Sequence, residues 1–189
     1  RMNIVLDWLK RKGIGLDTLE AVVGRGGILM PMPGGTYKVT DKMVEDLKAS
    51  VREEHASNLG GLIARGIADR EGIPSFIVDP VAVDEFEDIA RISGLPELPR
   101  RSLTHALNIK AVARKVAESR GKKMEDMNLV VAHLGGGISI CAHKKGRIVD
   151  AHQSNDDGAF SPERAGSVPV GDFIRLAYSG KYSQRELKR

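Results

Sequence analysis

The sequence predicts an α/β protein with a mixed sheet, and two observations support this fold class. Short apolar runs typical of buried strands, such as residues 76–78, alternate with longer segments whose apolar residues recur at helical spacing, such as residues 55–70. Near the middle of the chain, three strand-like segments follow one another without an intervening helix. Alternating strands and helices combined with such a β-meander favour a mixed sheet over an all-α or all-β fold.

The expected elements follow one another in a regular order. Strands are expected over residues 19–23, 36–39 and 76–78, and helices over residues 4–12, 41–47, 55–70 and 171–178, with a further helix capped by Ser102 or Thr104. Ser183 and Glu186 have the spacing of a capping box, which predicts the start of another helix. Because the chain opens within one helix and closes as another begins, we expect it to be an internal fragment of a longer protein.

Residues 129–150 form the meander, which reads as strand, glycine turn, strand, turn and strand. Dinucleotide-binding loops and P-loops lead from a strand into a helix, whereas Gly135, Gly136 and Gly137 lead into another strand. Neither GxGxxG nor GxxxxGK[ST] occurs here, so both of those sites are excluded. The remaining interpretations are a turn whose bare backbone N–H groups approach an anion, and a hairpin that needs glycine for its geometry alone.

Composition narrows the class of protein. Of the 189 residues, 41% are hydrophobic and 29% are charged, and no apolar run is long enough to cross a membrane. The single cysteine, Cys141, excludes an intrachain disulfide and favours a cytoplasmic location. The net charge is +4, but the basic residues are scattered and only 4% of residues are aromatic, which argues against nucleic-acid binding. A small polyanion such as a nucleotide explains the excess charge at least as well.

Several polar residues are expected where ligands gather, beyond the carboxyl ends of strands. Arg25, Asp79 and His133 each end an apolar run, and Arg164 lies in the later loop SPERAG. Two arginines near a glycine turn suit phosphoryl chemistry, because guanidinium groups form paired hydrogen bonds with phosphate oxygens. The alternative is that each arginine is a surface ion-pair partner, as most arginines in proteins are. Asp79 could contact magnesium, act as a base, or cap the strand end before Pro80.

The other histidines are weaker candidates. His55 and His105 lie near helix starts, where a structural histidine with satisfied hydrogen bonds is the usual outcome. His143 and His152 have no spacing that pairs them with other ligands as a zinc site, and both are interpreted as structural.

Eight segments together resemble the acetokinase family, and its butyrate kinases in particular. They are GRGG, PMPGGTYKV, EHASNLGGLIA, FIVDPVAVDEF, RISGLPE, RSLTHALN, AHLGGGIS and FSPERAGSVPVGD. The resemblance implies parts of two ribonuclease H-like domains of the sugar kinase, Hsp70 and actin superfold, facing each other across a cleft. Residues 1–127 would be the end of the first, carboxylate-binding domain, and residues 128–189 the start of the second, nucleotide-binding domain.

The resemblance also implies an activity: reversible, ATP-dependent phosphorylation of a short-chain carboxylate, butyrate above all, to an acyl phosphate. Asp79, His105 and Arg164 would be catalytic, and Arg25 and His55 would bind the carboxylate. The ATP phosphates would lie on the turn formed by His133, Leu134, Gly135, Gly136 and Gly137. The implied partners are the carboxylate and ATP or ADP, with Mg²⁺ held mostly by ligands outside this chain. No metal ligand is assigned within it, and a homo-oligomer is expected at full length.

A carboxylate nucleophile is ionised near neutral pH and needs no general base. We therefore expect Asp79 to orient arginines, a histidine or Mg²⁺ rather than to take a proton. Family members are longer at both ends, and the loop AHQSNDDGAF looks altered, so the chain alone is expected not to turn over ATP and butyrate. Two alternatives stay open: a non-catalytic phosphate-binding or assembly module on the same fold, and an acetate- or propionate-specific kinase.

Overall fold

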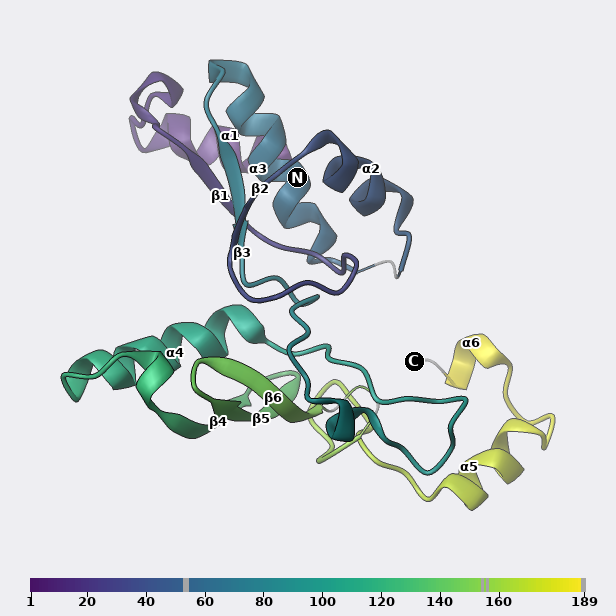
Figure 1. Cartoon of the computed structure of the whole chain (residues 1–189). Helices are drawn as coiled ribbons and strands as arrows, with labels where there is room; N and C mark the ends of the chain where they lie inside the picture. The colour runs from purple at the N-terminus through teal and green to yellow at the C-terminus, as the bar shows by residue number, and fades with distance from the viewer. Residues whose placement is uncertain (53–54, 154, 156, 188–189) are drawn as a thin grey trace.

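A computed structural model describes residues 1–52, 55–153, 155 and 157–187. Figure 1 shows two lobes, connected by the segment that follows β3, and an arm formed by the last two helices. The arm contains α5 (Val170–Ala177) and α6 (Gln184–Leu187). Strands and helices alternate in the first lobe, and a meander of three strands forms the sheet of the second. The α/β class expected from the sequence is therefore confirmed.

The first lobe is built on a small mixed sheet covered by helices. Its elements are α1 (Met2–Arg11), β1 (Val22–Arg25), β2 (Thr36–Lys38), α2 (Asp41–Ala49), α3 (Asn58–Glu71) and β3 (Ser75–Val78), with a 3₁₀ turn at Leu16–Thr18. The strand order is β1-β3-β2, and β3 runs parallel to β1 but antiparallel to β2. The carboxyl ends of β1 and β3 consequently meet at one edge, where Arg25 lies beside Val78.

Two glycines allow α3 to lie directly on β1. A Cβ atom on Gly60 would be 1.8 Å from the carbonyl oxygen of Arg25, and one on Gly24 would be 2.3 Å from the carbonyl oxygen of Gly60. Any side chain at these positions would therefore push helix and strand apart. The apolar residues Leu47 and Ile77 belong to the core of this lobe. This packing determines the position of β1, and with it the position of Arg25 at the end of that strand.

The second lobe contains the meander predicted around the glycines. Its elements are a 3₁₀ turn at Asp88–Arg91, α4 (Ala106–Ser119), a 3₁₀ turn at Met124–Asp126, β4 (Asn128–Leu134), β5 (Ile138–Lys144) and β6 (Arg147–Gln153). The three strands are antiparallel in the order β4-β5-β6. His133 pairs with Ser139 across the glycine turn. The turn and the last residues of β4 are thus held in register by the whole hairpin.

The core of the second lobe also includes residues that precede the meander. Ile109 of α4 is fully buried in one cluster with Val83, Cys141 and Ile148. These apolar contacts cross the domain boundary expected between residues 127 and 128. The division into residues 1–127 and 128–189 stays a prediction, but the packing groups α4 with the second sheet. Cys141 is buried as expected, and burial raises the pKa of its thiol to about 12.

The helix caps explain where several elements begin. The Thr40 side chain accepts a hydrogen bond from the backbone N–H of Met43 and caps the start of α2. The capping box is also confirmed: Ser183 N–H donates to the Glu186 carboxylate at 2.8 Å. The cap expected for α4 is wrong, because His105 occupies the N-cap position and the Ser102 hydroxyl donates to the carbonyl oxygen of Val83.

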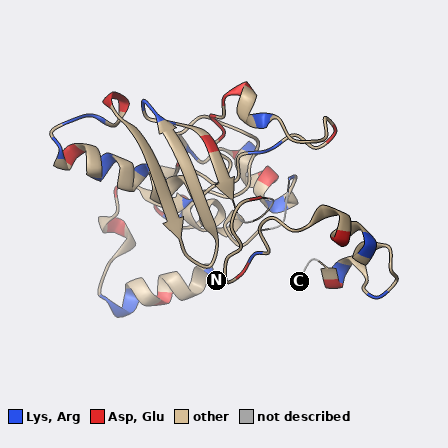
Figure 2. Ribbon diagram, turned by 90° about the horizontal axis from the view of Figure 1, so that it is seen from below, with Lys and Arg blue, Asp and Glu red and all other residues tan. Residues whose placement is uncertain are grey.

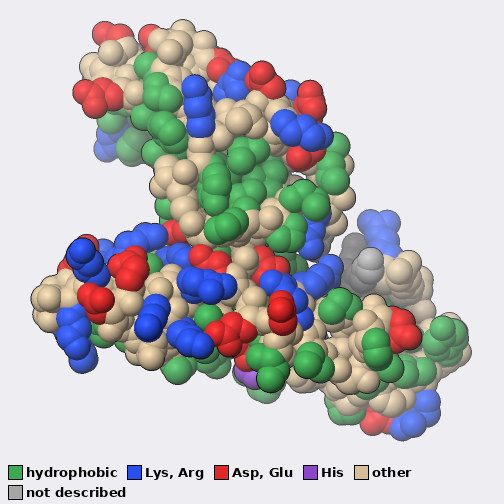
Figure 3. Space-filling view, in the orientation of Figure 1, with side chains coloured by type: hydrophobic (Ala, Val, Ile, Leu, Met, Phe, Trp, Pro, Cys, Tyr) green, Lys and Arg blue, Asp and Glu red, His purple; other side chains and the backbone are tan. Residues whose placement is uncertain are grey.

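Charged side chains of both signs are interspersed over the molecule. Figure 2 shows Lys and Arg alternating with Asp and Glu along the helices and loops, and Figure 3 shows the same mixture on the face of the second lobe that it presents. Within the part of the chain that the structure describes, no helix has both the length and the apolar character needed to cross a bilayer.

Candidate active site

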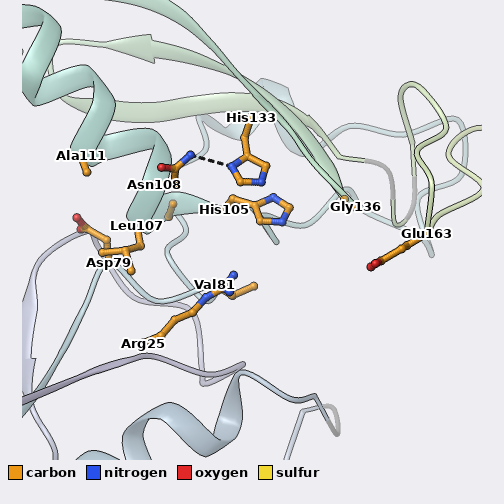
Figure 4. A pocket seen from close by; sticks show the side chains of 12 residues that line it. Arg25, Asp79, Val81, His105, Leu107, Asn108, Ala111, His133, Gly136 and Glu163 are labelled. Carbon is orange, nitrogen blue, oxygen red and sulfur yellow. Dashed lines mark hydrogen bonds between the residues drawn. The ribbon is translucent and has the colours of Figure 1, made fainter. Parts of the chain in front are cut away.

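A cavity of about 510 Å³ collects most of the residues that the sequence singled out (Figure 4). The first lobe contributes Arg25, at the last position of β1, and Asp79, directly after β3. The second lobe contributes His105 at the start of α4 and His133 near the end of β4, together with two glycines of the turn, 136 and 137. Segments separated by more than a hundred residues therefore meet around one space.

A smaller cavity of about 190 Å³ adjoins the first, and Arg25 and His105 line both. It adds His55 and Arg164, so all the predicted site residues except Leu134 and Gly135 line one of the two spaces. Leu134 is 73% exposed. It lines neither of the two cavities.

Asp79 is buried and both of its carboxylate oxygens have partners. Oδ1 accepts the backbone N–H of Gly35 at 2.8 Å, and Oδ2 accepts from Nη2 of Arg114 at 2.6 Å. The backbone of Asp79 has a φ of 38°, an uncommon value for a residue other than glycine. Such strain persists where the surroundings determine the conformation, and here a return hydrogen bond from Asp79 N–H to the Gly35 carbonyl does so. Asp79 thus joins β3, the loop before β2, and α4.

His105 and His133 stack face to face, with ring centroids 3.9 Å apart and ring planes inclined by 6°. Each ring is held at Nδ1: His105 by the Ser139 hydroxyl at 3.0 Å, and His133 by the amide nitrogen of Asn108 at 2.9 Å. The other ring nitrogens approach the glycine turn. Nε2 of His133 lies 3.2 Å from where a Cβ atom on Gly135 would be.

Both stacked rings are neutral near pH 7. Burial, followed by the neighbouring His133, Arg25, Arg164 and His55, lowers the pKa of His105 to about 4. Burial and then Arg25 also lower the pKa of His133. The physical cause is that a positive charge on either ring would be poorly solvated and would face other cations. These histidines can therefore donate hydrogen bonds at neutral pH without carrying a charge.

The glycine turn is anchored from outside by the loop that carries Arg164. Gly135 N–H donates to the Gly137 carbonyl at 3.1 Å, which closes the turn. The Gly136 carbonyl accepts from the Ser161 hydroxyl at 2.7 Å and from Glu163 N–H at 3.1 Å. A Cβ atom on Gly136 would lie 2.8 Å from the Glu163 carboxylate. The bare glycine therefore lets this loop close over the turn.

Arg164 and His55 occupy the rim of the smaller cavity. Nε of Arg164 donates to Oδ1 of Asn155 at 2.7 Å, and Nη1 donates to the Glu163 carbonyl at 2.8 Å. Nδ1 of His55 lies 2.8 Å from the Ser57 hydroxyl. These hydrogen bonds fix the orientation of both side chains relative to the loops on which they lie. Among the described residues, no group of three or more His, Cys, Asp or Glu side chains could hold a metal ion.

Three residues of the site were missed from the sequence. Asn108 and Arg114 lie on α4, three and nine positions after His105. Helical spacing from His105 could have indicated Asn108, because residues three apart share a helix face. Glu163 precedes Arg164 and lines both cavities, so a carboxylate stands beside the turn expected to bind phosphate. No local pattern distinguishes Arg114 from other exposed helix arginines.

Comparison with known proteins gives consistent matches. The sequence profile of the Acetokinase family matches residues 97–156. A "Probable butyrate kinase" of Clostridium botulinum (strain Eklund 17B / Type B) is 56% identical over 188 residues, covering 99% of this chain and 53% of the relative. "Butyrate kinase 2" of Clostridium acetobutylicum has the same identity and coverage. The chain is thus similar to acetokinase-family proteins over residues 97–156 and to butyrate kinases over nearly its whole length. It spans about half the length of the curated relatives it matches.

Two solved structures have the same fold as this chain. Acetate kinase from Porphyromonas gingivalis superposes with a TM-score of 0.78 at 18% identity, covering 98% of this chain and 50% of that one. A propionate kinase from Francisella tularensis gives a TM-score of 0.69 at 20% identity, with the same two coverages. The chain therefore shares the fold of these two solved structures, which agrees with the two-lobed architecture around the cavity.

Proposed function

We propose that these residues form the reaction cleft of a kinase that uses ATP to phosphorylate a short-chain carboxylate, with butyrate as the preferred substrate, giving an acyl phosphate reversibly. The observation that carries the proposal is the convergence of Arg25, His105, His133 and the glycine turn on one cavity. Identity of 56% to proteins named butyrate kinase supports the choice of carboxylate. Among the side chains that line this cavity, the cation Arg25 and the neutral donors His105 and His133 suit anionic reactants, and the Asp79 carboxylate already accepts hydrogen bonds from Arg114 and Gly35.

In the proposed reaction, a carboxylate oxygen forms a bond to the γ-phosphorus of ATP while the bond from that phosphorus to the bridging oxygen breaks. ADP leaves with the electron pair, and no proton is transferred. Arg25, with His55, would bind the carboxylate, and His105 and Arg164 would stabilise charge on the transferred group. His133 and residues 134–137 would hold the ATP phosphates. Asp79 would act by position, because its two oxygens already accept hydrogen bonds.

A divalent metal such as Mg²⁺ is part of the proposal for the whole protein, but the residues that the structure describes do not fit one. Both Asp79 oxygens are engaged, and the described residues contain no cluster of three or more candidate ligands. We therefore propose that its ligands lie mostly outside this chain, and we assign no step to the ion. A cytoplasmic location, a homo-oligomeric state and the absence of nucleic-acid binding belong to the same proposal.

The proposal can be tested in a chimera that carries this chain in place of the matching segment of Clostridium acetobutylicum butyrate kinase 2, of which it covers 53%. With ATP and butyrate, trapping by hydroxylamine should yield butyryl hydroxamate well above background, whereas the chain alone should stay at background. A series of C2 to C5 carboxylates would measure chain-length preference. A folded chimera that binds ATP but forms no hydroxamate would contradict the proposal.

The alternative is a non-catalytic phosphate-binding module, and the observation that favours it is that Arg164 donates its hydrogen bonds to Asn155 and to the Glu163 carbonyl of its own loop. Arg164→Ala in the chimera separates the two. A kinase should lose turnover by about a hundredfold or more and keep nucleotide binding, because the arginine acts on the transition state. A module should show no change. Arg120→Ala, at an exposed residue after α4, is the matched control.

A further inference from the structure

The His133 ring is contacted by two residues, the N-cap of α4 and Asn108 within α4, and the proposed reaction assigns no role to Asn108. His105 and Asn108 lie three residues apart at the start of α4, so they project from the same side of the helix. His105 stacks on the ring of His133, and Asn108 reaches its edge (Figure 4). One helical turn thus determines both the plane and the rotation of the His133 ring.

The chemistry of the Asn108 contact determines which nitrogen of His133 carries the proton. The amide nitrogen of Asn108 faces Nδ1 at 2.9 Å. An amide NH₂ group only donates, so Nδ1 must accept and be unprotonated. A neutral imidazole with a bare Nδ1 carries its proton on Nε2. The contact therefore selects the Nε2–H tautomer.

The selected proton points to the glycine turn. Nε2 of His133 lies 3.2 Å from the position of a Cβ atom on Gly135, and Nε2 of His105 lies 3.3 Å from that of a Cβ atom on Gly137. An anion resting on the turn would meet an N–H group in the selected tautomer. In the other tautomer it would meet a lone pair, and the contact would be repulsive.

We propose that Asn108 is a positioning residue that holds His133 as the Nε2–H tautomer, so that this ring donates a hydrogen bond to an anionic oxygen on the glycine turn. Only the identity of the anion, an ATP phosphate, rests on the proposed function. The charged groups around the ring are Arg25, Asp79 and Glu163, which line the same cavity, and the stacked neighbour is His105. Asn108 makes a hydrogen bond to the ring, whereas these groups influence it through electrostatic interactions across the cavity.

The test reads the tautomer in the ¹⁵N-labelled chain at pH 7, using long-range ¹H–¹⁵N correlations of the imidazoles. His133→Gln identifies the His133 signals. The expected result is a protonated Nε2 and an unprotonated Nδ1. Asn108→Asp reverses the polarity of the contact because a carboxylate accepts, so Nδ1 should become protonated and the pKa of His133 should rise. Asn3→Asp, at an exposed residue of α1, adds the same charge away from the cavity and should change neither property.

Two outcomes would overturn the proposal: a protonated Nδ1 in the unchanged chain, or an Asn108→Asp variant that keeps the tautomer and pKa of the unchanged chain. Asn108→Ala removes the contact without adding charge, and should give a mixture of tautomers while the backbone amide spectrum shows an intact fold. With ATP as the probe, Asn108→Ala should bind about three- to tenfold more weakly. If the tautomer is as expected but the unchanged chain does not bind ATP, the nucleotide site fails and the assignment of Asn108 stands.

Discussion

Arg114 of α4 and Asp79 at the end of β3 join the two lobes through an ion pair with 2.6 Å between Nη2 and Oδ2. The Asp79 side chain has no exposed surface, whereas the Arg114 side chain is 44% exposed. The pair therefore has a buried anion and a cation that reaches it from the surface. It also lies directly beside the cavity, because Asp79 lines that space.

Replacing Arg114 with Met should destabilise the chain, because a buried carboxylate loses its charged partner and keeps only the Gly35 N–H. We expect a loss of about 2 kcal/mol in the free energy of unfolding, below the value for a fully buried pair because Arg114 is partly solvated. Urea denaturation measures it. Arg175→Met, which breaks an exposed pair with Asp172, should cost less than about 0.5 kcal/mol. Equal effects of the two variants would refute this account.

Lys110 and Glu85 form a second ion pair, and this one is buried on both sides. Their side chains are 4% and 9% exposed, and Nζ also donates to the Gly146 carbonyl. The Glu85 carboxylate accepts backbone N–H groups from Gly34 and Ile148. Burial acts to raise the pKa of Glu85, but these hydrogen bonds and Lys110 outweigh it, and the pKa is lowered.

Lys110→Met should therefore cost about 3 kcal/mol of unfolding free energy, because the charged carboxylate stays buried. Lys144→Met is the control, since its pair with Glu87 is exposed and should contribute less than about 0.5 kcal/mol. The double variant Lys110→Met, Glu85→Leu should not recover the loss, because the N–H groups of Gly34 and Ile148 lose their acceptor. Full recovery in thermal or urea denaturation would show that the loss in the single variant comes from the unpaired charge of Glu85, and that the hydrogen bonds from Gly34 and Ile148 contribute little to stability.

Gly60 is the glycine of α3 least able to accept a side chain. Its Cβ atom would lie 1.8 Å from the backbone oxygen of Arg25, and that atom cannot move without shifting β1. We expect Gly60→Ala to cost about 3 kcal/mol. Gly66→Ala on the same helix meets only the flexible end of Met2, and should stay within about 1 kcal/mol of the unchanged chain. Tolerance of alanine at residue 60 in urea denaturation would mean that α3 does not rest on β1 in solution.

His143 should make stability depend on pH. Burial, followed by Lys110, lowers its pKa to about 4, although Glu85 acts in the opposite direction. An unfolded histidine titrates near pH 6.5. Below that pH the unfolded chain binds a proton that the folded chain does not, so stability falls between pH 6.5 and about 4 and this contribution levels off below that range.

His143→Leu should abolish that contribution. Within the described part of the chain neither ring nitrogen has a hydrogen-bond partner, so the substitution should be tolerated at pH 7. Between pH 7 and pH 5, we expect the unchanged chain to lose about 2 kcal/mol more unfolding free energy than the variant. Urea denaturation at the two pH values measures this difference. Identical losses would show that His143 titrates normally in the folded chain.

Local rules determined the elements of this chain. The apolar runs marked β3 and the meander, and the Ser183–Glu186 spacing marked a helix start. Each of these patterns depends on residues within a few positions of one another, and local backbone chemistry is sufficient to produce it. The family resemblance also indicated many of the site residues, because the motifs of a family can be matched along the sequence without knowing where those residues lie in space.

Tertiary structure alone decided how those residues act on one another. The stack of His105 on His133, the contact of Asn108 with that ring, and the ion pair from Arg114 to Asp79 join residues that are 25 to 35 positions apart or on different elements. Such contacts depend on how α4 lies against the second sheet, and that is determined by the shape of the buried core. The pKa of a histidine and the partner of a carboxylate follow from burial and neighbouring charge, which no local pattern encodes.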